Sequence, residues 1–450
     1  MSKYADTIII SDSIFDSVAE FPYKGFICIT DGLISNIIKG EYTGDYKNEN
    51  TVVIEATGMT VMAGAIDVHC FFAGYALEQY QKLNNKPLTE PTPDLLKEIL
   101  NNREYIIPFF KNHMKMLNSK GITAVKEIGF DDYYGFTTIL EELEKSNELS
   151  VRFHFMSQPM ESAINIPYGI SMREKFSSDF VKFSGFNMMT DGSVSDNCAE
   201  IKEPYLDMDT CCMQDINWDQ IKADVLLADE NGFRYSLHAQ GDAAIHNAIE
   251  VLDNCQKTPD GKLKNRHAIT DLEFSDASDF VKMGNIGIVG EIYPQIQSLA
   301  HRKDKLEMID TKIGLDRGQN YWNRRSALDA GVTLSCGTDL PLLIDDIPES
   351  IYHAVGGLFP DSDLPFNQSN MISRAELLKA WTYGGAYNLS IEKKAGSLEV
   401  GKFADLVIFD GDLFRTDINS IKNIKVKYTY LAGNLVFQNW AFEKISVNLI

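Results

Sequence analysis

The middle of the chain alternates short apolar segments with amphipathic ones, and this alternation is the strongest constraint on the fold. Apolar, β-branched runs predict strands at residues 121–125, 151–156, 233–237, 286–292 and 332–336. Residues 243–252 have their apolar side chains at spacings of 1, 3 and 4, which predicts a helix directly after the third of these strands. Repeated strand–helix units predict an α/β fold with a parallel sheet. Over roughly 330 residues, a closed (β/α)8 TIM barrel fits this pattern better than an open sheet.

Both ends of the chain read as short strands instead. These runs cover residues 7–10, 26–29, 33–38 and 52–54 near the start, and 404–409, 426–431 and 435–437 near the end. We expect the two ends to meet in one small β-sandwich domain. The predicted bounds are 1–62 plus 397–450 for this composite domain and 63–396 for the TIM-barrel catalytic domain.

Charge and cysteine content exclude several classes of partner. The net charge is −22, which disfavours nucleic acid and anionic membranes. The seven cysteines are irregularly spaced, with no Cys-x-x-Cys pair, so a structural zinc ribbon is not expected. No apolar signal core follows the N-terminus, and no run approaches the roughly 18 apolar residues of a membrane span. These features predict a reduced, cytoplasmic protein that acts on a small molecule.

Polar residues follow apolar runs at five places, and active sites of such barrels lie at the C-terminal ends of strands. These places contain His69, Asn187 with Asp191, His238, His267 with Asp271, and Asp339. Imidazole nitrogens and carboxylate oxygens are standard ligands of zinc. Taken singly, a histidine there is more often a packed residue, and an aspartate more often a turn former or N-cap. The order of these residues along the chain is what favours a shared site.

Four motifs together resemble one family. Residues 63–69 are similar to Pro-Gly-Phe-Ile-Asp-x-His-x-His, and residues 395–407, Ala-Gly-Ser-Leu-Glu-Val-Gly-Lys-Phe-Ala-Asp-Leu-Val, look like a specific C-terminal signature. His-Ala-Gln-Gly-Asp at 238–242 and Gly-Thr-Asp-Leu-Pro at 337–341 look like fifth- and eighth-strand motifs. The chain thus resembles the amidohydrolase superfamily, in the branch of N-substituted formamide deformylase-like enzymes.

This resemblance implies a TIM barrel with a small β-sandwich from both chain ends, and a homodimer as the typical assembly. It also implies one or two divalent metals, often zinc, and hydrolysis of amide or related C–N bonds. His69, His238 and Asp339 match the family's metal-site positions by residue type.

Three of the six usual metal-site positions are substituted. Phe71 stands at the second histidine of the His-x-His pair, Asn187 at the lysine that is carboxylated in binuclear relatives, and Asp271 at the sixth-strand histidine. Asn187 cannot form a carbamate and Phe71 has no lone pair to offer. A standard binuclear centre is therefore not expected.

Three interpretations follow. In the first, a hydrolase of non-peptide C–N bonds holds one divalent ion through His69, His238 and Asp339, with Asp271 as a fourth ligand. Zinc suits this set best, and iron or manganese are alternatives. Water activated by the ion would attack the carbonyl carbon, and Asp339 would pass the proton to nitrogen.

In the second interpretation the enzyme uses no metal. His238, Asp271 and Asp339 then form an acid–base cluster suited to hydration, elimination or isomerisation. Glu127, His154 and Glu291 also lie on predicted strands and could face the same pocket. In the third interpretation catalysis has been lost, and the fold serves as a binding or assembly protein.

Overall fold

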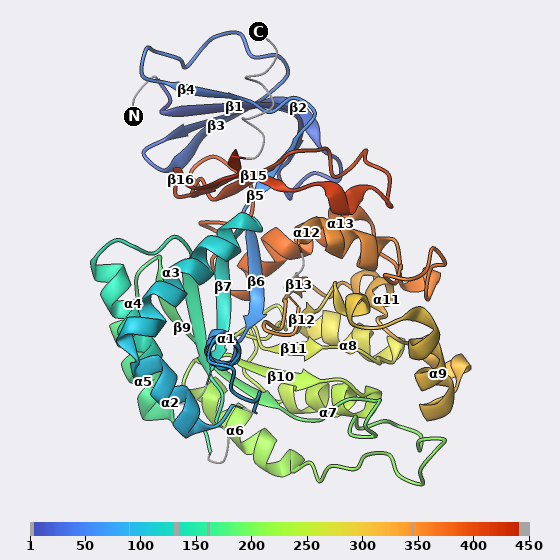
Figure 1. Cartoon of the computed structure of the whole chain (residues 1–450). Coiled ribbons are helices and arrows are strands. Elements are labelled where there is room, and N and C mark those ends of the chain that lie inside the picture. The colour runs from blue at the N-terminus through green and yellow to red at the C-terminus, as the bar shows by residue number, and fades with distance from the viewer. Residues whose placement is uncertain (1–3, 90, 130–134, 160–162, 344–345, 441–450) are drawn as a thin grey trace.

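The computed structural model describes residues 4–89, 91–129, 135–159, 163–343 and 346–440. A barrel of strands wrapped by helices forms the larger part, and a separate sheet lies against one end of it (Figure 1). The first strands of the chain and the last strands of the described part share this second sheet, although about 340 residues separate them in the sequence.

The barrel consists of parallel strands, each hydrogen-bonded to the next one in the chain. They are β6 (Ala65–Cys70), β7 (Ile122–Gly129), β8 (Arg152–Ser157), β9 (Val181–Met189), β10 (Tyr235–Ala239), β11 (Ala268–Asp271), β12 (Val289–Ile292) and β13 (Leu334–Cys336). A parallel bridge between Cys70 and Leu340 joins the end of β6 to the segment after β13. The predicted (β/α)8 barrel is therefore confirmed.

The helices cover the outside of the barrel and its loops (Figure 1). They are α1 (Phe72–Leu83), α2 (Pro93–Asn101), α3 (Arg103–Ser119), α4 (Phe136–Lys145), α5 (Ile166–Lys175), α6 (Trp218–Glu230), α7 (Asp242–Leu252), α8 (Ala277–Ile286), α9 (Arg302–Lys312), α10 (Leu315–Gly318), α11 (Arg324–Asp329), α12 (Ile347–Ser350), α13 (Arg374–Lys379) and α14 (Gly385–Asn388). The helix predicted at residues 243–252 corresponds to α7.

One predicted strand begins later than expected. Ile286, expected to open a strand, is the last residue of α8, and β12 starts at Val289. The side chain of Asp276 caps the start of α8 by accepting from the N–H of Ser278, and Gly287 ends the helix with a left-handed φ of 77°. A glycine in this conformation stops a helix without steric cost, so the apolar run is divided between two elements.

The second sheet combines both ends of the described chain. Its order is β16-β15-β14-β5-β1-β2-β3, and β4 also pairs with β1. The strands are β1 (Thr7–Phe15), β2 (Tyr23–Thr30), β3 (Leu33–Lys39), β4 (Val52–Glu55), β5 (Thr60–Ala63), β14 (Leu406–Phe409), β15 (Val426–Leu431) and β16 (Asn434–Gln438). The fold class is as expected. The domain bounds of 1–62 plus 397–450 and 63–396 stay a prediction, and residues 441–450 lie outside the described part.

A buried ion pair connects the two parts of the molecule. Arg152, at the start of β8, donates from Nε and Nη2 to the carboxylate of Asp405, at 2.7 and 3.0 Å. The two side chains are only 2% and 3% exposed. The carbonyl of Asp405 also accepts from the N–H of Gly64, just before β6.

No helix among the described residues is long and apolar enough to cross a membrane.

Candidate active site

Three of the four candidate site residues line one cavity at the C-terminal ends of the barrel strands. His69 lies near the end of β6, His238 near the end of β10, and Asp339 shortly after β13. The cavity has a volume of about 510 Å³. Its lining comprises His69, Phe71, Gly74, Leu77, Glu78, Gln81, Leu88, Thr89, Pro91, Ile128, Gly129, Gln158, Asn187, Met189, His238, Asp339 and Pro341.

The four candidate residues form two histidine–carboxylate pairs. His69 Nε2 lies 3.5 Å from an oxygen of Asp339, and His238 Nε2 lies 3.2 Å from an oxygen of Asp271. The histidine and Asp271 side chains are 8–9% exposed, whereas that of Asp339 is 34% exposed at the cavity. Asp339 is therefore the carboxylate of this set that a ligand in the cavity reaches most easily.

Electrostatics differ between the two pairs. Burial opposes the charged form of His238, but its hydrogen bond and charge interaction with Asp271 outweigh burial and raise its pKa to about 9. Burial raises the pKa of Asp339, and the nearby imidazoles only partly offset this effect. The site thus keeps a proton on His238 at neutral pH and draws the Asp339 carboxyl toward its protonated form.

Unusual backbone conformations hold both aspartates in place. Asp271 has a φ of 83° and Asp339 a φ of 50°, in the left-handed region. Such conformations are uncommon outside glycine and cluster at functional sites, where surrounding contacts maintain them. For Asp339, one contact is its own N–H, which donates to the carbonyl of His69 at 2.8 Å. The two members of this pair are therefore joined through the backbone as well.

Asp191, in the second of the five sequence segments, binds the backbone just after His238. Its carboxylate accepts from the N–H groups of Gln240, Gly241 and Glu200, each at 2.9 Å. Burial raises its pKa to about 6. Asp191 thus anchors the loop that follows β10 and does not line the cavity.

Glu291 on β12 lies inside the barrel, fully buried, next to His69. Its Oε2 accepts from Thr270 Oγ1 at 2.6 Å and lies 3.7 Å from His69 Nδ1. Its Oε1 accepts from Asn388 Nδ2 at 2.9 Å and pairs with Lys126. Burial disfavours the charged form of Glu291, but Lys126 and its other partners hold the pKa of this carboxyl well below its ordinary value. The ionised carboxylate faces Nδ1, so that Nε2 of His69 points to Asp339.

Two other strand residues considered from the sequence have structural partners. Glu127 accepts from the N–H of Phe72 at 2.7 Å and from the thiol of Cys70 at 3.3 Å, and burial raises its pKa to about 8. His154 Nδ1 lies 3.1 Å from Ser184 Oγ, and burial lowers its pKa to about 3. Neither residue is part of the cavity lining.

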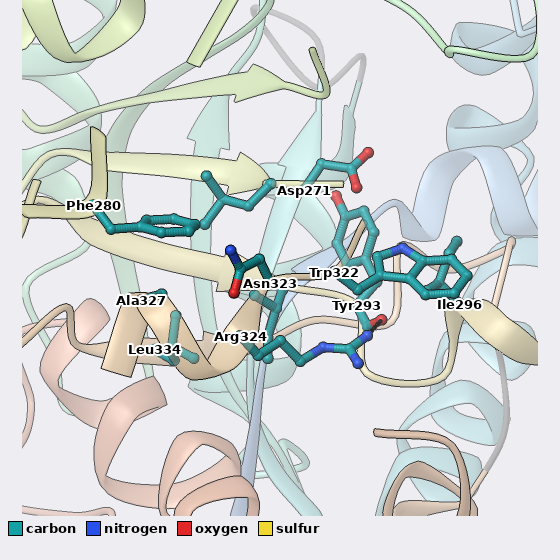
Figure 2. A pocket seen from close by; sticks show the side chains of 11 residues that line it. Asp271, Phe280, Tyr293, Ile296, Trp322, Asn323, Arg324, Ala327 and Leu334 are labelled. Carbon is teal, nitrogen blue, oxygen red and sulfur yellow. Dashed lines mark hydrogen bonds between the residues drawn. The ribbon is translucent and has the colours of Figure 1, made fainter. Parts of the chain in front are cut away.

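A second, much smaller cavity lies beside Asp271. It holds about 10 Å³, roughly the space of one water molecule. Figure 2 shows the phenol ring of Tyr293 directed toward Asp271, with Trp322 and Arg324 behind it. The buried hydroxyl of Tyr293 has no hydrogen-bond partner among the described residues, and its ring packs edge-on against His69 at 5.5 Å. No motif in the sequence singles out Tyr293, which directly follows β12.

The histidine–carboxylate pairs have a spacing that suits metal ligands. Two ligand atoms on one tetrahedral zinc lie about 3.4 Å apart, given Zn–N and Zn–O bonds of about 2.0–2.2 Å. The observed separations of 3.5 and 3.2 Å match this value. His69 Nδ1 and His238 Nδ1 are buried without a hydrogen-bond partner in the described structure. Within each pair the nitrogen and oxygen donors fit a divalent ion such as zinc. No three of these four residues bring one donor atom each within 4.8 Å of one another, so a shared ion would require the two pairs to approach each other.

A different trio brings its donor atoms closest together. Among the described residues, only Asp229, Cys255 and His267 place three such atoms within 4.8 Å of one another. However, His267 Nδ1 accepts from the N–H of Tyr235 at 2.9 Å, so its other nitrogen carries the proton that faces Asp229 at 3.0 Å. A ring with both nitrogens engaged has no lone pair for a metal. This trio therefore serves to fix β10 and β11.

Comparisons with known proteins identify the family of this chain. The model of the amidohydrolase family matches residues 74–437. Putative amidohydrolase YtcJ of Bacillus subtilis (strain 168) is 24% identical over 269 residues, which cover 59% of this chain and 49% of that protein. N-substituted formamide deformylase of Arthrobacter pascens is 24% identical over 218 residues, 47% of this chain and 38% of that protein. The chain thus spans less than half of these two curated relatives.

A solved structure supports the fold across almost the whole chain. An uncharacterised metal-dependent hydrolase from Pyrococcus horikoshii OT3 superimposes with a TM-score of 0.71 at 16% identity, covering 92% of this chain and 99% of that one. The family match extends over far more than half of the sequence, from α1 to β16. This chain belongs to the amidohydrolase family.

Proposed function

We propose that this protein hydrolyses a non-peptide C–N bond of a small molecule with the help of one divalent metal ion. His69, His238 and Asp339 would bind the ion, and Asp271 would be the fourth ligand. The observation that carries this proposal is the pairing of each histidine with a carboxylate, at ligand-like separations of 3.5 and 3.2 Å, beside a cavity of about 510 Å³.

The residues of the chain have separate tasks in this reaction. A divalent ion would supply hydroxide from bound water at neutral pH and polarise the carbonyl group. Asp339, whose pKa is raised by burial, is suited to hold the transferred proton and deliver it to the leaving nitrogen. Glu291 lies 3.7 Å from Nδ1 of His69 inside the barrel and would keep this ring oriented, as carboxylates behind metal-binding histidines do.

One observation favours the metal-free alternative as a second candidate. The raised pKa of His238, about 9, describes an imidazolium paired with Asp271, which repels a cation. In that state His238 and Asp339 would act as acid and base for hydration, elimination or isomerisation. The two candidates differ in whether the histidines carry a metal or a proton.

The test begins with His238→Ala in a screen of small amides, lactams and hydration substrates. Both enzymatic candidates predict that turnover falls to background, since His238 is a ligand in one and an acid in the other. Chelator treatment followed by addition of zinc separates them: loss and recovery of activity supports the hydrolase, and unchanged activity supports the metal-free enzyme.

His301→Ala is the matched control, because His301 is 69% exposed on its side chain and lies at the start of α9, outside the cavity lining. It should behave as the wild-type protein does. Full activity of the His238→Ala variant removes His238 from the mechanism and contradicts both candidates.

A further inference from the structure

We propose that the cavity selects uncharged or cationic amides with an apolar body and rejects anionic ones. This inference rests on the proposed function, since it assigns a substrate class to the same site. It follows from the side chains that surround the cavity away from the two histidine–carboxylate pairs.

One wall of the cavity is a face of α1. Gly74, Leu77, Glu78 and Gln81 follow one another at helical spacings, and all of them line the cavity. A side chain at Gly74 would collide with the ring of Phe71, whose Cδ1 lies 2.5 Å from the position of the added Cβ. This wall therefore combines the apolar side chain of Leu77 with the polar side chains of Glu78 and Gln81.

Large apolar side chains remain exposed where the cavity opens. Leu88 is 59% exposed and Met189 is 57% exposed, and both line the cavity. Pro91 and Ile128 add further apolar surface. Apolar groups gathered at a concave opening indicate contact with an apolar part of a ligand.

The charges of the lining are acidic. Glu78 and Asp339 are its carboxylates, and no lysine or arginine belongs to the lining among the described residues. His69 and His238 each lie against a carboxylate, Asp339 and Asp271 respectively. Away from a metal ion held by the histidine–carboxylate pairs, a carboxylate or phosphate on the ligand would thus lose its hydration without gaining a cationic partner, which is costly.

Lys82 is a lysine close to the cavity that does not belong to its lining. Lys82 pairs with Glu78 from outside the cavity, but its side chain is 50% exposed, and such surface pairs contribute little. An ammonium group on the ligand can therefore compete with Lys82 for the Glu78 carboxylate. In the sequence, residues 90, 130–134, 160–162 and 344–345 also contain no lysine or arginine.

Neutral amide groups supply the polar contacts that an uncharged ligand needs. Asn187 and Gln158 both line the cavity, and their side-chain amides hydrogen-bond to each other at 2.5 Å. With its amide group turned over, Asn187 also donates to the carbonyl of Ser236 and accepts from the N–H of Met188, both at 3.3 Å. The amide nitrogen of Gln158 is the group that can donate to the carbonyl of a substrate amide.

The test compares three probes of equal length that differ in charge: hexanamide, hexylamine and hexanoate. Binding is measured by calorimetry with the chelator-treated protein, because a bound metal ion would itself attract the carboxylate of hexanoate. We expect hexanamide and hexylamine to bind at least about ten-fold more tightly than hexanoate in this form. Hexanoate binding as tightly as hexanamide, or no binding by any probe, overturns the proposal.

Variants at Glu78 sharpen the result. Glu78→Gln should weaken hexylamine several-fold and leave hexanamide unchanged, whereas Glu78→Lys should strengthen hexanoate. Glu98→Gln, an exposed change on α2, is the matched control and should change none of the three affinities. Unaltered hexylamine affinity in Glu78→Gln contradicts the assigned role of Glu78.

The substrate class and the proposed function can be contradicted separately. An order of affinities led by hexanoate overturns the substrate class even if metal and turnover are found. Conversely, a protein without metal or turnover can still show the predicted order of binding.

Discussion

Asp67 accepts two hydrogen bonds from Thr338, from its backbone N–H at 3.0 Å and from its Oγ1 at 2.6 Å. Asp67 precedes His69 on β6, and Thr338 precedes Asp339 after β13. The carboxylate of Asp67 also accepts from the N–H of His69 at 3.1 Å. These contacts fix the two segments that carry the first histidine–carboxylate pair, at the place where the last strand of the barrel meets the first.

Replacing Asp67 by alanine should therefore weaken both the fold and the site. Three buried donors lose their acceptor, so the free energy of unfolding should fall by about 2–4 kcal/mol. Thr338→Val removes the hydroxyl bond to Asp67 and the bond that the hydroxyl accepts from the N–H of Leu340, and should cost about 1–2 kcal/mol. Denaturant unfolding measures both, and an Asp67→Ala variant as stable as the wild type contradicts this role.

The ion pair between Arg152 and Asp405 yields a second prediction. Asp405→Ala leaves a buried guanidinium without its carboxylate and should lower the free energy of unfolding by about 3–5 kcal/mol. Lys24 and Glu41 form an exposed pair on the terminal sheet, and Glu41→Ala should change the same quantity by less than about 1 kcal/mol. Similar losses for the two variants in urea would show that burial of the first pair is unimportant.

His113 on α3 predicts a dependence of stability on pH away from the site. Its ring packs against Phe72 and Phe110, both nitrogens lack partners in the described structure, and burial lowers its pKa to about 3. Between pH 3 and 6.5 the unfolded chain then binds more protons at this position than the folded chain. The free energy of unfolding should therefore decrease as the pH falls below about 6.5.

His113→Phe removes this proton uptake. The free energy of unfolding should then fall less steeply with decreasing pH, by the contribution of at most one proton to the slope, while stability at pH 7 is kept or increased. The measurement is a series of urea unfolding curves from pH 5 to 8, with the exposed variant His301→Gln as control. An unchanged slope for His113→Phe would show that His113 does not contribute.

Tyr293 should affect stability and activity in opposite directions. Its buried hydroxyl lacks a hydrogen-bond partner among the described residues, so Tyr293→Phe should leave the melting temperature unchanged or raise it. The same hydroxyl faces Asp271 (Figure 2), and burial together with the charge of Asp339 raises its pKa, so loss of the hydroxyl should reduce turnover. A thermal scan and an activity assay of one preparation test both, and a clear loss of stability with full activity would contradict this expectation.

The sequence predicts what depends on local pattern. The apolar face of α7 and the β-branched strands follow from residue spacing, and both β-rich ends enter one sheet as expected. The four candidate residues were found because they lie at or shortly after the ends of strands, and parallel strands of a barrel bring such positions to one end. The division of the run at 286–292 depended on the single residue Gly287.

Long-range polar contacts could not be predicted in this way. Asp67 and Thr338 are 271 positions apart, and Lys126 and Glu291 are 165 apart. Their pairing depends on which strands face each other across the closed barrel. The same holds for Tyr293, whose direction toward Asp271 follows from packing against His69 and not from any motif.

We propose that side chains from four strand ends form one metal centre. Elemental analysis of protein purified without chelators tests it most directly, with wild type beside His69→Ala, His238→Ala, Asp271→Ala and Asp339→Ala. We expect about one divalent ion per chain in the wild type and clearly less in each variant. A wild-type protein that retains no metal while catalysing turnover, or variants that keep the full metal content, would contradict it.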